Sequence, residues 1–178
     1  MKLQEVQETF CNIIKSRKVP EDLNDEYFAR ISASGNLQLV KKIVESWRTI
    51  QIVQFSVLTC NYLRSIDMLQ RHIDGFIRTV NFSSFRNEVG FQFLDYLINI
   101  GADDITVSLA ELELNLIRQM LGKEVYYSKI WHINPYEFID LLIKNSFTNS
   151  FILENCDYKI TISPEFKDEL FSVEKMEK

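Results

Sequence analysis

Glycine and proline are scarce in this chain, which has five glycines and three prolines among its 178 residues. So few turn-forming residues cannot supply the many turns of an all-β sandwich, and they suit long helices joined by short loops. Hydrophobic residues make up 46% of the chain and aromatic residues 12%, which indicates a packed core and argues against disorder. The sequence therefore predicts a mainly α fold.

Cysteine and histidine are also rare. Cys11, Cys60 and Cys156 are far apart and lack C-x-x-C spacing, so neither a disulfide framework nor a zinc site is predicted, and the apolar surroundings of the first two indicate small buried side chains. His132 lies in an apolar run typical of a hydrogen-bonded core or interface histidine, whereas His72 is expected to be solvated. The chain also lacks glycine-rich phosphate loops and G-x-S-x-G, so binding is favoured over catalysis.

The charge pattern excludes other classes of function. A formal net charge of -5 with scattered lysines and arginines does not favour nucleic acid as a ligand. No stretch is free of charge over the length that a membrane span needs, and Lys2, Glu5 and Glu8 argue against a secretory signal. We expect a soluble, cytoplasmic protein with no nucleic-acid or membrane partner.

Apolar residues recur with helical spacing over residues 1–122. This spacing, with cap and breaker residues, predicts helices over 3–16, 24–35, 66–80, 91–101 and 104–121. Residues 36–69 are helical throughout and exceed one buried stripe, so we expect two helices with a break between Arg48 and Gln51. Residues 1–122 are therefore predicted to form a helical bundle domain.

Residues 123–178 have a different character and are predicted to form a small α+β unit. Residues 125–133 favour a strand, and Asn134-Pro135 begins a helix. Residues 150–154 and 158–162 show the alternation of a half-buried hairpin. Ser163-Pro164 predicts one more short helix, and the charged end from Val173 is expected to fray.

Glu113 lies within the apolar arc of the helix predicted over 104–121, while Glu111 points to its opposite, solvent-facing side. A buried carboxylate needs a partner, which we expect to be an arginine, a tyrosine hydroxyl or backbone donors of a neighbouring helix. We expect an architectural role for this buried charge rather than a catalytic one. The candidate arginines are Arg48, Arg64 and Arg86.

The predicted hairpin offers a strand edge to which an extended peptide can add, although most such edges are simply solvated and Lys159 would blunt this one. The candidate peptide-binding residues are Phe151, Ile152, Leu153, Glu154, Tyr158, Lys159, Ile160, Thr161 and Ile162.

Three segments carry a resemblance to a known family: FQFLDYL at 91–97, LAELELNLIR at 109–118 and WHINP at 131–135. Over about residues 40 to 170 the chain resembles the partner proteins of multinuclear non-haem iron oxidative enzymes, which modify cysteines of ribosomally made precursor peptides, as in methanobactin biosynthesis. The resemblance implies a non-catalytic subunit that holds no cofactor, docks on an iron enzyme and binds the leader of a precursor peptide. The iron is expected in the partner enzyme.

Two other functions stay open from the residues alone. One is a free-standing helical scaffold or regulator that binds a protein through its surplus aromatic surface. The other is an enzyme that uses His132 or Glu113.

Overall fold

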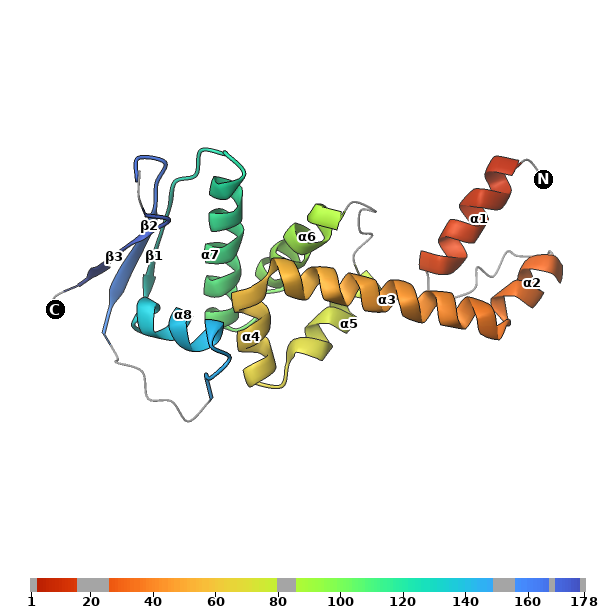
Figure 1. Ribbon diagram of the computed structural model, residues 1–178, viewed down its shortest axis with the longest axis horizontal. Helices are drawn as coiled ribbons and strands as arrows, with labels where there is room; N and C mark the ends of the chain where they lie inside the picture. Colours follow the sequence, from red (N-terminus) through yellow and green to blue (C-terminus); the bar gives the residue numbers. More distant parts are fainter. Residues whose placement is uncertain (1–2, 16–25, 80–85, 149–155, 167–168, 177–178) are drawn as a thin grey trace. The chain divides into compact units, whose positions relative to one another are not determined.

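The fold is mainly α with a small antiparallel sheet near the C-terminus, as predicted (Figure 1). The computed structural model describes residues 3–15, 26–79, 86–148, 156–166 and 169–176. The chain divides into two compact units, residues 1–50 and 51–178. In the part of the chain that is described, no helix is both long and apolar enough to cross a membrane.

The first unit contains α1 (Leu3–Lys15), α2 (Glu26–Ser32) and most of α3 (Gly35–Phe55). Its core is small and is centred on Ile13, Phe28 and Leu37. The rings of Phe10 and Phe28 meet edge to face with centroids 5.5 Å apart. Both short helices were predicted, because each carries its own apolar stripe.

The second unit holds the remaining elements. Four helices come first in the chain, and a three-stranded sheet with one more helix follows. They are α4 (Val57–Ser65), α5 (Leu69–Thr79), α6 (Arg86–Asn99), α7 (Asp104–Met120), β1 (Tyr127–Trp131), α8 (Pro135–Ile143), β2 (Tyr158–Ile162) and β3 (Ser172–Lys175).

Helix α7 packs on both of its sides within this unit. Ala110 and Leu114 belong to one buried cluster, with residues of α4, α5 and α6. Leu109 and Leu112 belong to a second cluster, which includes Trp131 of β1 and residues of α8 and β2. The predicted domain boundary between residues 122 and 123 therefore falls inside a unit whose helical and β-containing parts share α7.

Two helix predictions were wrong at their boundaries. The long helical span breaks at Ser56 and not between Arg48 and Gln51. The Ser56 hydroxyl donates to the carbonyl of Ile52 at 2.6 Å and makes no cap bond to α4. The sixth helix starts at Arg86, ahead of the predicted Phe91. Neither boundary is marked by a proline, so the local pattern did not reveal it.

The close packing of α6 depends on a glycine. A Cβ atom at Gly90 would lie 2.3–2.5 Å from the side chain of Phe55. Real Cβ contacts are never so short, so the missing side chain lets this part of α6 approach the end of α3.

The predicted ending of the chain was also wrong. Pro164 and Glu165 form a turn and not the start of a helix, and Ser172–Lys175 form β3 where a frayed end was predicted. Val173 is registered opposite Ile160 of β2, so it adds to the second buried cluster. The pairing with β2 supplies the order that the charged sequence does not indicate.

Candidate functional site

The sheet has strand order β1-β2-β3, and both pairs of strands are antiparallel. Strand β2 is the central strand, so both of its edges are used in hydrogen-bonded ladders. A peptide strand therefore has to pair with β1 or β3 and cannot pair with residues 158–162. This corrects the predicted edge at Tyr158, Lys159, Ile160, Thr161 and Ile162. The other predicted binding residues, Phe151 to Glu154, lie outside the described residues.

The register shows which backbone groups face the open edge of β1. Met176 N–H donates to the carbonyl of Asp157 at 2.8 Å, so these two residues form a hydrogen-bonded pair between β3 and β2. Because bonding directions alternate along a strand, Tyr158, Ile160 and Ile162 turn their backbone groups toward β1. Their partners on β1 are Trp131, Lys129 and Tyr127.

The intervening residues of β1, Ser128 and Ile130, turn their N–H and C=O groups to the other side. Within the described ranges, no strand pairs with that side of β1. This part of the chain also carries exposed apolar side chains, since Tyr126 is 72% exposed and Ile130 is 49% exposed. Strand β3 is less suited to pairing, because it is only four residues long and ends in Glu174 and Lys175.

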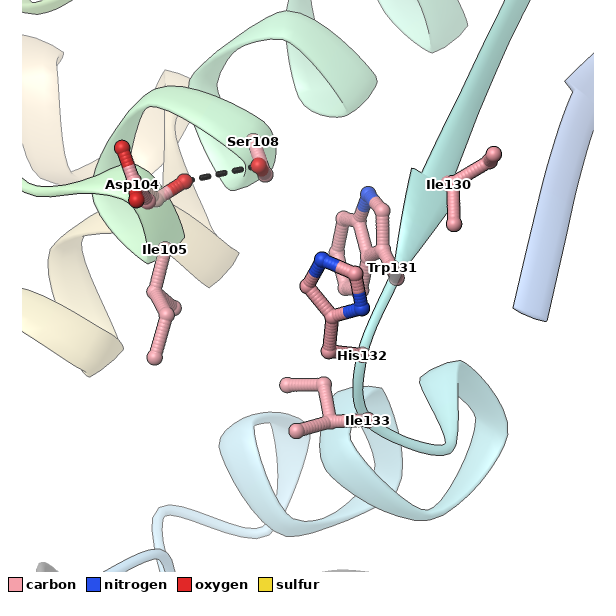
Figure 2. A pocket seen from close by; sticks show the side chains of 7 residues that line it. All are labelled: Asp104, Ile105, Ser108, Ile130, Trp131, His132 and Ile133. Atoms are coloured by element: carbon pink, nitrogen blue, oxygen red, sulfur yellow. Dashed lines mark hydrogen bonds between the residues drawn. The ribbon is translucent and has the colours of Figure 1, made fainter. Parts of the chain in front are cut away.

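A cavity of about 270 Å³ lies beside the end of β1, between it and the first turns of α7 (Figure 2). From α7 it is lined by Asp104, Ile105 and Ser108. From β1 and the residues after it, Ile130, Trp131, His132 and Ile133 complete the wall. The walls are mostly apolar, and the Ser108 hydroxyl is bound to the backbone carbonyl of Asp104 at 2.7 Å.

His132 was predicted to be a hydrogen-bonded core or interface histidine; it is hydrogen-bonded, but it does not lie in the core. Its side chain is 78% exposed, and Nδ1 lies 2.8 Å from a carboxylate oxygen of Asp157. Asp157 comes 25 residues later in the chain, directly before β2, so local sequence could not supply this partner. His72 was expected to be solvated, but it is partly buried beside a second, more open cavity of about 880 Å³, and burial lowers its pKa.

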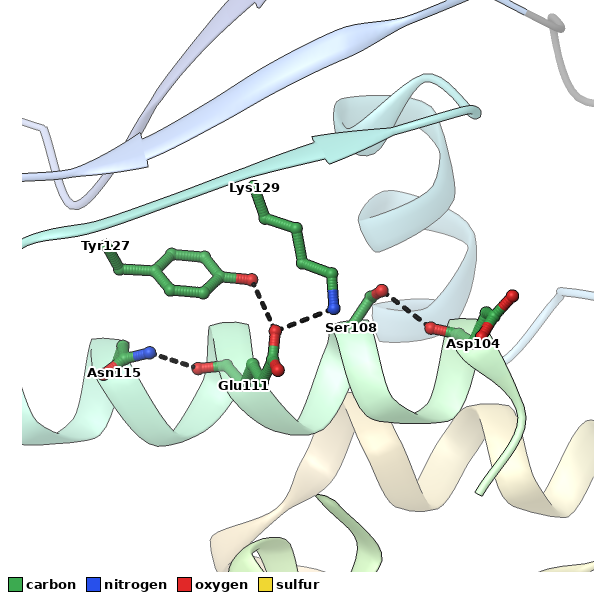
Figure 3. A network of polar contacts seen from close by, with 6 residues as sticks. All are labelled: Asp104, Ser108, Glu111, Asn115, Tyr127 and Lys129. Atoms are coloured by element: carbon green, nitrogen blue, oxygen red, sulfur yellow. Dashed lines mark hydrogen bonds and ion pairs between the residues drawn. The ribbon is translucent and has the colours of Figure 1, made fainter. Parts of the chain in front are cut away.

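Glu111 faces β1, so the prediction that it points to the solvent-facing side of the helix was wrong. Figure 3 shows Tyr127 and Lys129 reaching from β1 to its carboxylate. Lys129 Nζ donates to Glu111 Oε2 at 2.8 Å, and the Tyr127 hydroxyl donates to the same oxygen at 3.3 Å. Burial raises the pKa of Tyr127, and the negative charge of Glu111 adds to that rise. These contacts fix the inner face of β1 against α7.

Glu113 is 6% exposed, and backbone donors satisfy it. Its two carboxylate oxygens accept the N–H groups of Leu58 at 2.9 Å and Thr59 at 3.1 Å, which belong to the first turn of α4. The carboxylate therefore acts as the cap that Ser56 does not provide.

Backbone donors of a neighbouring helix were one of the three kinds of partner expected for Glu113. Of the candidate arginines, Arg64 donates instead to Asn61 at 2.7 Å, and the side chain of Arg86 lies outside the described residues. Arg48 belongs to the first unit, where it lies near Glu45. Glu113 lines neither described cavity, and its contacts support the predicted architectural role.

Sequence reasoning missed the features that define this site. The open edge of β1 depends on strand order, and the cavity joins residues 104–108 with residues 130–133. The only local signal was the predicted strand over 125–133 and its exposed apolar positions. No protein-family model, curated protein or solved structure matches this chain.

Proposed function

We propose that this chain is a non-catalytic, peptide-binding subunit and that an extended peptide binds by adding a strand to the open edge of β1. The observation that carries the proposal is the outward direction of the backbone groups of Ser128 and Ile130, next to a cavity large enough for a side chain. Main-chain pairing supplies affinity in this mode of recognition, and pockets for alternate side chains supply specificity.

The rigidity of β1 supports this proposal. Its inner face is held on α7 through the Glu111 contacts, and its other edge is bonded to β2. Trp131 is 4% exposed and packs edge to face against Phe138, with ring centroids 6.2 Å apart. An edge that is ordered in advance loses little conformational entropy when a peptide pairs with it.

The resemblance to partner proteins of iron enzymes extends the proposal. The bound segment is then the leader of a ribosomally made precursor peptide, and the chain docks on a multinuclear iron oxygenase that modifies the cysteines of that peptide. Co-expression with an iron enzyme encoded beside the gene is expected to yield a stable heterodimer. A metal-free monomer without affinity for any leader peptide would overturn this extension.

A proline substitution tests the open edge directly. Ser128→Pro removes an outward N–H group, and proline is tolerated where that group faces away from the sheet. One ladder hydrogen bond contributes about 0.5–1.5 kcal/mol, so affinity for a bound peptide should fall about two- to tenfold. The probe is a peptide enriched from a displayed library of random nonamers and labelled for fluorescence anisotropy.

Ser128→Ala is the matched control, because it shortens the side chain and keeps the N–H group. It should bind the peptide like the parent chain, and both variants should retain the fluorescence of buried Trp131. The edge proposal fails if Ser128→Pro binds as tightly as Ser128→Ala, or if no peptide in the library is enriched.

One observation favours a second function, that of a free-standing helical interaction or regulatory scaffold. Helix α3 exposes a stripe with 3-4-3 spacing: Val40 is 40%, Ile43 48%, Trp47 59% and Ile50 50% exposed. Exposed apolar residues at heptad spacing suit a helical partner. If a co-purifying partner is lost on Trp47→Glu and kept on Ser128→Pro, the scaffold function is favoured. Turnover by the isolated chain would instead establish an enzyme.

A further inference from the structure

We infer that the cavity between α7 and the end of β1 selects a lysine or arginine side chain of the bound peptide, at the position paired with Trp131. This inference rests on the proposed strand addition at β1 and adds the class of residue that is recognised. The carboxylate of Asp104 is the selecting group.

The pairing geometry places one peptide side chain at the cavity. Side chains directly opposite one another on neighbouring strands point to the same face of a sheet. The side chain of Trp131 lies on the inner face, since it belongs to the buried cluster that includes Leu109 and Leu112 of α7. A peptide residue paired with Trp131 therefore also points toward α7, where the cavity is lined by Asp104 and Ile105 (Figure 2).

The cavity walls suit a long side chain with a charged end. Ile105 and Ile133 provide apolar surface along the cavity, and the exposed Asp104 adds an acidic side chain from the first turn of α7. Lysine and arginine bury their methylene groups on apolar surface and keep the charged group at a polar end. A volume of about 270 Å³ accommodates one such side chain.

Charge complementarity favours a basic peptide side chain in the cavity over other long side chains. Lys129 of β1 and His132, which follows the strand, already have carboxylate partners, because Lys129 Nζ lies 2.8 Å from Glu111 and His132 Nδ1 lies 2.8 Å from Asp157. Among the described side chains, none forms an ion pair with Asp104.

A cationic side chain in the cavity would form an ion pair with the carboxylate of Asp104. A peptide aspartate or glutamate would meet like charge, and an aliphatic residue would cover the walls without pairing Asp104. The cavity therefore discriminates by charge as well as by the length of the side chain.

The test uses a displayed library of random nonamer peptides, selected in parallel on the parent chain and on Asp104→Arg. Peptides enriched on the parent should share a lysine or arginine at one position, and Asp104→Arg should replace it by aspartate or glutamate. Substitution of the basic residue by norleucine should weaken binding by up to about fivefold, as expected for a partly exposed ion pair. Added salt should reduce that difference.

The controls separate this inference from the proposed function. Glu137→Arg makes the same charge change at an exposed position on α8 and should leave the selected residue unchanged. Peptides that lose affinity on Ser128→Pro, yet show no basic preference or no change on Asp104→Arg, would overturn the inference and leave strand addition standing. If no enriched peptide responds to Ser128→Pro, strand addition fails, and the inference fails with it.

Discussion

Glu113→Gln is the sharpest perturbation for the architecture of the second unit. The carboxylate accepts two N–H groups of α4 at 2.9 and 3.1 Å, and the serine that precedes α4 makes no side-chain cap bond. Glutamine has nearly the same shape but keeps only one acceptor oxygen. Its amide nitrogen is a donor, so it faces an N–H group that then has no acceptor.

The expected magnitude follows from that single lost acceptor. A buried donor left without a partner costs about 1–3 kcal/mol, and loss of a side-chain cap costs about 0.5–2 kcal/mol. Removal of the buried charge offsets part of this loss when the carboxylate is ionised. We therefore expect the free energy of unfolding to fall by about 1–3 kcal/mol at acidic pH and by less at neutral pH.

The direction of this pH dependence comes from the pKa of Glu113. Burial raises it above its ordinary value of 4.5, and the N–H groups of Leu58 and Thr59 oppose the rise. The folded chain thus holds this proton more tightly than the unfolded chain. The stability that protonation contributes is fully present below 4.5 and is lost as the pH rises through the folded-state pKa. Glutamine does not titrate, so the stability difference between parent and variant should narrow as the pH rises.

Urea unfolding measures both effects. Trp131 is 4% exposed and belongs to the second unit, so its fluorescence follows the unfolding of that unit in a Trp47→Phe background. Glu124→Gln, the same substitution at an exposed position, is the matched control and should leave the free energy of unfolding unchanged. Parent-like stability of Glu113→Gln at every pH would refute the capping role. A destabilisation independent of pH would refute the raised pKa.

Three further predictions concern other parts of the fold. Gly90→Ala should lower the free energy of unfolding by about 1–3 kcal/mol, because its Cβ has no room. Gly35→Ala is the control, because its Cβ would meet nothing within 4 Å, and it should not lower the free energy of unfolding. Equal losses of stability for the two variants in urea titrations would contradict the close contact of Gly90 with Phe55. Burial raises the pKa of the Cys60 thiol to about 12, so a disulfide reagent should modify half-buried Cys156 faster than Cys60; equal rates for these two thiols in mass mapping would contradict this. Asn134 accepts the N–H groups of α8 residues at 3.1 and 3.4 Å, so Asn134→Ala should cost about 1 kcal/mol, and an unchanged thermal midpoint would exclude the cap.

Local patterns predicted most elements of this chain. The span of α7 follows from its apolar spacing and from Asp103, which accepts the Thr106 N–H at 3.0 Å. The start of α8 follows from Asn134-Pro135, and the strands at 127–131 and 158–162 lie within the predicted segments. Each of these signals lies within a few residues of the element that it specifies, so one sequence suffices to recognise it.

The errors arose where distant residues decide local structure. After the break at Ser56, the first turn of α4 is capped by Glu113, which lies 55 residues beyond Leu58 and 54 residues beyond Thr59. Strand β3 depends on its pairing with β2, because its own sequence, SVEK, has little strand character. His132 is an exposed side chain that pairs with Asp157, a residue directly before β2 and 25 positions further along the chain.

The sequence by itself determined a mainly α chain, a small sheet near its end and a buried carboxylate at Glu113 that needs a partner. These conclusions rest on periodicity, capping and the cost of an unpaired charge, which are properties of short segments. Tertiary structure alone decided which partner Glu113 has, which strand has an open edge and where the cavity lies. Those features join α7 to α4 and to β1, so they follow from how the helices and the sheet pack and not from any segment alone.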